Sequence, residues 1–187
     1  MTVYEVVHRV LDVLEAERRP LDYIMVGAMA VARWGFPRST SDADFVLAAP
    51  GSVVDEMLSQ LPDEFQVEEQ ARMELFTGTM RWVVDVKGTA FKVEVFLQGS
   101  DPHHQAEFAR RCRQRIPVLN REAWIPTAED LIIQKLRWAR PKDIQDIDAI
   151  LRVQSSALDF PYIEKWCAIH STQARLDELR RSIPPDL

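Results

Sequence analysis

Two aspartates separated by one residue, Asp42 and Asp44, stand just before the apolar run Phe45-Val46-Leu47. In an extended strand, residues two apart point to the same face, so these carboxylates would lie side by side. Their repulsion would be removed by a divalent cation. Mg²⁺ is suited to this role, because it prefers oxygen ligands and is usually held by one or two carboxylates plus substrate phosphates. The alternative is that both are solvated loop residues, with Asp42 capping a turn.

A third carboxylate, Glu94, has the strand parity expected of a site residue. Glu94 would share a strand face with Lys92, whereas Val93 and Val95 would face the opposite way, into the core. The alternative is a glutamate on an ordinary solvent-exposed face. Combined with Asp42 and Asp44, Glu94 would complete a cluster of three acids.

Gly27 lies where an apolar strand passes into a short helix. A helix N-terminus presents free backbone N–H groups and a partial positive charge, both of which favour phosphate. Because glycine has no side chain, a ligand can approach its backbone closely. The order strand, glycine, helix, Asp-x-Asp and a later acid therefore predicts a phosphate and metal site.

The elements that must position these residues follow from apolar periodicity, caps and turn residues. Thr2 and Glu5 have the spacing of a capping box at the start of the first helix. We expect helices at residues 2–19, 28–34, 52–61, 101–115, 127–136 and 143–153, two more capped by Asp159 and Ser171, and strands at 21–26, 43–48, 65–67, 81–86 and 91–97. This order predicts an α+β fold, a mixed sheet flanked by helices, with a core at 1–120 and a helical C-terminal segment at 121–187.

The sequence resembles the nucleotidyltransferases of the DNA polymerase beta-like superfamily. The stretch VGAMAVARWGFPRSTSDADFVL has their order of strand, glycine, short helix and Asp-x-Asp, and FKVEVF resembles their third-acid strand. The stretch IPTAEDLIIQKLRWARPKDIQDIDAIL is similar to the C-terminal helices of AbiEii-type and related small bacterial members. The resemblance covers about residues 21–155. Ala28 stands where the pattern has a second Gly or Ser, and Glu94 stands where it has Asp.

The resemblance implies a magnesium-dependent transfer of a nucleoside monophosphate from a nucleoside triphosphate, such as ATP or CTP. Asp42 and Asp44 would hold a metal, and Glu94 would help to hold a second one or accept a proton. Gly27 and Ala28 would offer backbone N–H groups to the phosphates.

Two cations are further candidates for binding the triphosphate. Lys135 resembles the lysine on the C-terminal helix of AbiEii-type proteins, and Arg38 lies in the turn before Asp42. The alternatives are a solvent-facing Lys135 and an Arg38 that forms a structural ion pair with Asp42 or Asp44.

Other chemistry has weaker signals. Adjacent histidines, as in His103-His104, do not share a helix face, which disfavours a metal site there. Asp143, Asp146 and Asp148 are better explained as acids near a helix N-terminus, with Arg140 and Lys142 as partners. Cys112 and Cys167 have no CxxC spacing, which disfavours zinc binding or a disulfide framework.

Composition limits the partners and the location. The chain of 187 residues carries 29 acidic and 23 basic residues, so nucleic-acid binding would require a local basic patch. No uncharged run approaches the roughly 18 residues that a membrane span needs, and we expect a cytoplasmic protein.

The predicted function is therefore transfer of a nucleotide to a hydroxyl of a protein or tRNA acceptor. A role in a toxin–antitoxin pair is one of the roles that the resemblance allows. The alternative is a weak or inactive nucleotide-binding or protein-interaction module that keeps the fold. Ala28 and Glu94 motivate this alternative, because a Cβ near the phosphates and a longer third acid could misplace the metals.

Overall fold

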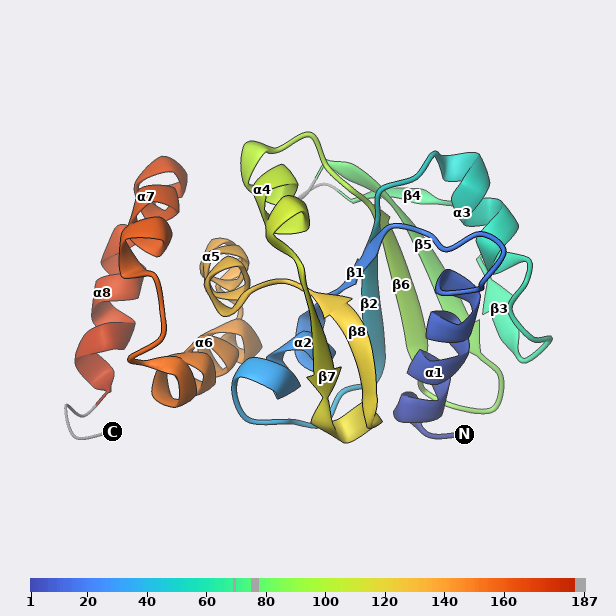
Figure 1. Ribbon diagram of the computed structural model, residues 1–187, viewed down its shortest axis with the longest axis horizontal. Coiled ribbons are helices and arrows are strands. Elements are labelled where there is room, and N and C mark those ends of the chain that lie inside the picture. Colours follow the sequence, from blue (N-terminus) through green and yellow to red (C-terminus); the bar gives the residue numbers. More distant parts are fainter. Residues whose placement is uncertain (69, 75–77, 184–187) are drawn as a thin grey trace.

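The computed structural model describes residues 1–68, 70–74 and 78–183 and confirms the α+β architecture (Figure 1). Its strands are β1 (Tyr23–Met25), β2 (Asp42–Leu47), β3 (Phe65–Val67), β4 (Arg72–Glu74), β5 (Thr79–Val86), β6 (Lys92–Leu97), β7 (Cys112–Ile116) and β8 (Arg121–Ile125). Its helices are α1 (Val3–Leu14), α2 (Gly27–Trp34), α3 (Gly51–Leu58), α4 (Pro102–Arg110), α5 (Ala128–Trp138), α6 (Pro141–Gln154), α7 (Phe160–His170) and α8 (Gln173–Ser182), with a short 3-10 turn at Pro117–Leu119.

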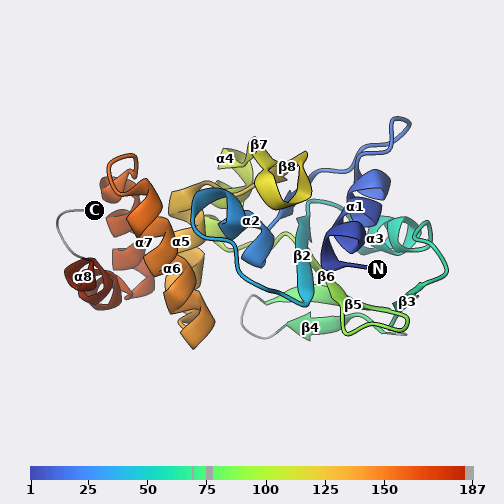
Figure 2. The same ribbon diagram turned by 90° about the horizontal axis from the view of Figure 1, so that it is seen from below.

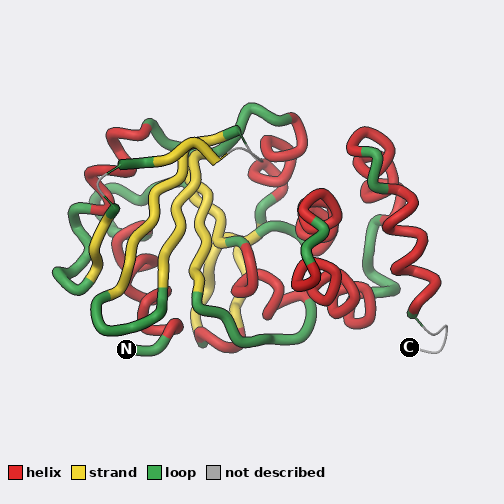
Figure 3. The backbone as a smooth tube through the Cα atoms, turned by 180° about the vertical axis from the view of Figure 1, so that it is seen from behind, coloured by secondary structure: helices red, strands yellow, loops and turns green. Residues whose placement is uncertain are grey.

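The main sheet has the strand order β1-β2-β6-β5-β3, and β4 also pairs with β5. Strands β2 and β6 are parallel, whereas the other pairings in this sheet are antiparallel. The strands lie side by side in Figure 3, with helices α5 to α8 gathered at one side of the molecule. In Figure 2, α1 and α3 lie together, on the side of the molecule away from α5 to α8. The predicted mixed sheet flanked by helices is therefore confirmed.

Buried and partly exposed side chains alternate along strand β2, as its sequence predicts. Ala43, Phe45 and Leu47 are buried, whereas Asp42 and Asp44 are only partly buried on the opposite face. The buried face joins Val6 and Leu11 of α1 in the main core. Burying the apolar side of this period-two pattern therefore turns the acids toward the other face.

The predicted long helix at 101–115 is wrong in its second half. Helix α4 ends at Arg110, and residues 112–116 form β7, which pairs with β8. In β7, exposed Arg113 and Arg115 alternate with less exposed neighbours, which is a strand period. Strand β8 occupies 121–125, where only helix was expected, so the hairpin spans the expected boundary at 120. We propose that the helical C-terminal segment begins at Ala128.

Some of the predicted helix caps are present in the structure and others are not. The Thr2 capping box and the Thr127 and Asp159 caps are present. Ser171 instead ends α7 in a left-handed conformation, and Thr172 precedes α8. Strand β4 was not predicted.

Strand β2 lies between β1 and β6, and its buried face allows a test of the core. Replacing Phe45 with Ala should lower the free energy of unfolding by about 3–5 kcal/mol, because a fully buried aromatic ring leaves a cavity. Phe36→Ala is the matched control, since Phe36 is 58% exposed and should cost less than about 0.5 kcal/mol. Equal losses in urea unfolding would contradict this assignment of the core.

Candidate active site

The parallel pairing of β2 with β6 places two of the predicted acids next to each other. Asp44 is the register partner of Glu94, and Asp42 is the partner of Lys92. Neighbouring strands lie about 4.8 Å apart, so Asp44 and Glu94 project from the same face at close range. Lys92 is turned to an ion pair with Asp85 at 3.2 Å.

Gly27 packs directly against Asp44. Its φ is +63°, and a Cβ at this position would lie 2.0 Å from Oδ2 of Asp44. The backbone N–H of Val26 donates to the carbonyl oxygen of Asp44 at 2.9 Å. No side chain in the described part of the protein caps the N-terminus of α2. The Asp44 carboxylate thus lies against an uncapped helix N-terminus.

These groups line a pocket of about 170 Å³ between the sheet and the C-terminal helices. Asp42, Asp44, Glu94 and Gly27 are at one end of it. Ala28 is buried and is not among the lining residues, whereas Gly27 is. The rest of the wall comes from Ile24, Val26, Val46, Thr79, Phe96, Leu97, Gly99, His104, Glu107, Leu131, Gln134, Lys135, Trp138, Arg140, Lys142 and Asp143.

The acids at this end carry an excess of negative charge. Burial, followed by the Glu94 and Asp42 carboxylates, raises the pKa of Asp44 to about 6. Burial also raises the pKa of Glu94, against the opposing effect of Arg81, whose Nη1 lies 3.3 Å from Oε1 of Glu94. A cation bound between Asp44 and Glu94 would relieve this repulsion.

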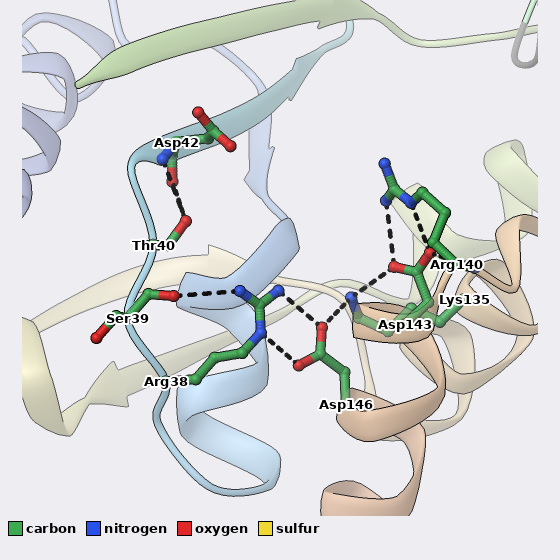
Figure 4. Close-up of polar contacts among 8 residues, drawn as sticks. All are labelled: Arg38, Ser39, Thr40, Asp42, Lys135, Arg140, Asp143 and Asp146. Carbon is green, nitrogen blue, oxygen red and sulfur yellow. Dashed lines mark hydrogen bonds and ion pairs between the residues drawn. The ribbon is translucent and has the colours of Figure 1, made fainter. Parts of the chain in front are cut away.

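The two cations predicted to bind phosphate take part in one ion-pair network (Figure 4). Arg38 donates from Nε and Nη2 to the two carboxylate oxygens of Asp146 at 2.7 and 3.0 Å. Nζ of Lys135 lies 2.7 Å from Asp146 and 3.5 Å from Asp143. Arg38 therefore pairs with neither Asp42 nor Asp44 and lies outside the pocket lining, whereas Lys135 is 7% exposed and lines the pocket.

Two other basic residues at the pocket, Arg140 and Lys142, were predicted from the sequence only to be partners of the acidic residues of α6. Arg140 does pair with Asp143, at 2.7 Å, but it also lines the pocket. Lys142 is exposed, makes no ion pair with any described residue, and favours the charged forms of Asp44 and Glu94. The sequence feature that could have indicated the position of Lys142 is Pro141, because proline is common at the first position of a helix. Pro141 begins α6 and places Lys142 in its first turn.

The acidic side chains Asp42, Asp44 and Glu94 are suited to a magnesium ion that arrives with a triphosphate. They are carboxylate oxygens, the ligands that Mg²⁺ prefers, and they adjoin a helix N-terminus that favours phosphate. Within residues 1–68, 70–74 and 78–183, no three His, Cys, Asp or Glu side chains are arranged as a ready-made metal cluster. Mg²⁺ does not require such a cluster when substrate phosphates supply further ligands.

Comparison with known proteins identifies the family. Residues 3–182 match the family described as nucleotidyltransferase of unknown function (DUF6036). The chain belongs to this nucleotidyltransferase family. No curated protein matches the sequence.

Solved structures share the fold. The crystal structure of ANT(2")-Ia in complex with adenylyl-2"-tobramycin has a TM-score of 0.59 and 17% identity, covering 93% of this chain and 99% of that one. The solution structure of the antibiotic-resistance factor ANT(2'')-Ia has a TM-score of 0.58 and 15% identity, covering 97% and 98%. An antigenic nucleotidyltransferase-like protein from Paracoccidioides brasiliensis has a TM-score of 0.55 and 17% identity, covering 95% and 89%. The nucleotidyltransferase fold is therefore shown, whereas the AbiEii-type subtype stays a prediction.

The contact between Gly27 and Asp44 can be tested with a matched pair of glycines. Gly88→Ala should cost about 1–2 kcal/mol of unfolding free energy, because its φ is +71° but no atom of the described residues lies within 4 Å of the new Cβ. Gly27→Ala should cost about 1–3 kcal/mol more, because its Cβ must also displace the Asp44 carboxylate. Equal losses in denaturant unfolding would argue against the close approach.

The raised pKa of Asp44 predicts a pH dependence of stability. The folded-state pKa of about 6 lies above the reference value of 3.8, so the folded state binds the proton more tightly. This group's contribution to stability therefore declines as the pH rises from about 4 to about 6. With Mg²⁺ chelated, Asp44→Asn should gain on the order of 1–2 kcal/mol relative to wild type over that range.

The control is Asp63→Asn, because Asp63 is exposed in a turn outside the pocket lining. Its stability difference from wild type should stay flat over the same pH range. If the Asp44→Asn difference were also flat, the repulsion assigned to Asp44 would be absent.

Proposed function

We propose that this protein is a magnesium-dependent nucleotidyltransferase that moves a nucleoside monophosphate from a nucleoside triphosphate to an acceptor hydroxyl. One observation carries the proposal: Asp44 and Glu94 are register partners on neighbouring parallel strands and project from the same face, with Asp44 against the uncapped N-terminus of α2. The membership of a nucleotidyltransferase family supports it.

Each group has a role in this reaction. Asp42 and Asp44 would hold Mg²⁺, which when bound stabilises the charge on the triphosphate oxygens. The N–H groups of Gly27 and Ala28 would donate to phosphate. Lys142 and Arg140 would neutralise the triphosphate, while Lys135 would act from the pocket wall, where Asp146 and Asp143 hold it. We place Arg38 behind Lys135, since it binds the same Asp146.

The covalent step is a displacement at the α-phosphorus. The acceptor oxygen forms a new bond to that phosphorus, the bond to the bridging oxygen of the β-phosphate breaks, and pyrophosphate leaves. Glu94 would accept the proton of the acceptor hydroxyl, because its raised pKa brings its basicity closer to neutral pH. The proton then passes to water.

The acceptor that we propose is a hydroxyl of a protein or an RNA, with a role in a toxin–antitoxin pair. This part of the proposal rests on the resemblance to AbiEii-type proteins. The ANT(2")-Ia crystal structure is a complex with adenylyl-2"-tobramycin, so a small molecule is a third acceptor to include in any test.

A second candidate function is nucleotide binding with little or no transfer. The observation that favours it is the Arg81–Glu94 ion pair, which engages the third acid at 3.3 Å and opposes its action as a base. The two candidates differ in a single product, since both bind Mg²⁺–nucleotide but only the enzyme releases pyrophosphate.

We expect purified protein with Mg²⁺, a nucleoside triphosphate and cell extract to release pyrophosphate. Asp44→Asn should reduce the rate at least about a hundredfold by misplacing the metal, and Glu94→Asp should stay within about tenfold of wild type. Asp63→Asn should be unaffected. If Asp44→Asn retained the wild-type rate, this mechanism would be wrong. Wild type that binds nucleotide without releasing pyrophosphate would favour the second candidate.

The acceptor is identified by the destination of the label. With α-labelled nucleotides, we expect label on protein or RNA, separated by protease and ribonuclease treatment. Label on small molecules alone would replace this acceptor assignment without affecting the roles of Asp44 and Glu94.

A further inference from the structure

The pocket has a second end, away from the acids, whose residues have no role in the transfer step. The face of β6 that carries Glu94 also carries Phe96, and the wall continues through Leu97 to α4 and α5. From Glu94 to Leu97 the strand extends about 10 Å. This distal end combines apolar side chains with the polar side chains of Glu107 and Gln134.

Glu107 is a buried acid in the wall of this distal end. It is 5% exposed, lines the pocket, and has no hydrogen-bond partner at Oε1 within the described residues. Burial and the Asp130 carboxylate raise its pKa well above the usual range. The guanidinium of Arg137, which would favour ionisation, is bound to Asp101 at 3.1 Å. Burial without a cation of its own favours the neutral form of Glu107, a carboxylic acid that can donate one hydrogen bond and accept others.

Gln134 supplies a second unsatisfied group in the same wall. Its Oε1 is buried and makes no hydrogen bond of normal geometry among the described residues; burial lowers the pKa of the nearby His104 imidazole, and the Gln134 side chain opposes this shift. Leu131, Gln134, Lys135 and Trp138 all line the pocket from α5, at the spacing of one helix face. Gln134 is thus adjacent in sequence to Lys135, which belongs to the phosphate end.

The kind of ligand that fits the distal end follows from the chemical groups that line it. Buried polar atoms need partners, and an orphan carbonyl oxygen needs an N–H donor. A neutral carboxylic acid in the same pocket wall can donate to a ring nitrogen. The flanking side chains Phe96, Leu131 and Trp138 suit the flat faces of an aromatic ring. An amino group beside a ring nitrogen acceptor, on a flat ring, satisfies both orphan groups.

We propose that Glu107 and Gln134 recognise the base of the nucleoside triphosphate, and that they select adenine or cytosine. The Gln134 oxygen accepts from the exocyclic amine, and the Glu107 hydroxyl donates to the adjacent ring nitrogen. Guanine and uracil present a carbonyl oxygen and a ring N–H at those positions, so an oxygen would face the Gln134 oxygen. This inference rests on the proposed function, because it uses the same pocket with the triphosphate at the acidic end.

The test is calorimetric affinity for ATP, CTP, GTP and UTP, each with excess Mg²⁺, measured on the 187-residue chain. Wild type should bind ATP or CTP at least about tenfold more tightly than GTP and UTP, which is the contribution of about one well-placed hydrogen bond. Glu107→Leu and Gln134→Leu should each remove most of this preference. Two separate variants guard against one that fails to fold.

Glu107→Gln is the decisive control, because an amide keeps a donor and an acceptor without a charge. It should retain the preference within about threefold. If Glu107 instead acted as an ionised carboxylate for a cationic group, Glu107→Gln would behave like Glu107→Leu, which would overturn the inference. Unchanged affinities in all three variants would also overturn it. Failure of wild type to bind any of the four nucleotides would instead remove the proposed function itself.

Discussion

The repulsion between Asp44 and Glu94 is the constraint on which the rest of the site depends. The parallel register of β2 and β6 forces these carboxylates together on one face, because the other face is committed to the buried core. Gly27 has no side chain, which allows the backbone of α2 to pack directly against the Asp44 carboxylate. Partial burial, followed by the neighbouring Glu94 and Asp42 carboxylates, raises the pKa of Asp44 to about 6. A site that keeps like charges on one face of two neighbouring strands is suited to a divalent cation.

The C-terminal helices complete the pocket through buried ion pairs. Arg38 comes from the segment before β2, Asp146 from α6 and Lys135 from α5, so their contacts join three segments of the chain (Figure 4). A buried charge pair is costly to break, because removal of one partner leaves the other charge without compensation. This network therefore holds the wall that carries Lys135 and Gln134 against the sheet. It also explains why the exposed Lys142, rather than Arg38, is the cation available to an incoming phosphate.

The features that sequence could predict are those governed by local periodicity. The shared face of Asp42 and Asp44, and the orientation of Glu94, follow from a strand period of two and are confirmed. The hairpin of β7 and β8 was missed because Arg113 and Arg115 continue the charged composition of α4, and its pairing is a tertiary contact. The Arg38–Asp146 contact joins residues 108 positions apart, which no local pattern encodes. Glu107 was missed because a glutamate in a charged helix is ordinarily exposed. None of the helices in the described part of the chain has the length and apolar composition to cross a membrane.

The central claim is that Asp42 and Asp44, beside Glu94, bind nucleotide through a divalent cation. The most direct measurement is calorimetric binding of a non-hydrolysable ATP analogue to wild type and Asp44→Asn, with either excess Mg²⁺ or a chelator. The expected result is binding by wild type with Mg²⁺ that weakens at least about a hundredfold, roughly 2.7 kcal/mol, in the chelator and in the variant. Binding of equal affinity in all four conditions would contradict the claim, because the nucleotide would then be held without the metal and without Asp44.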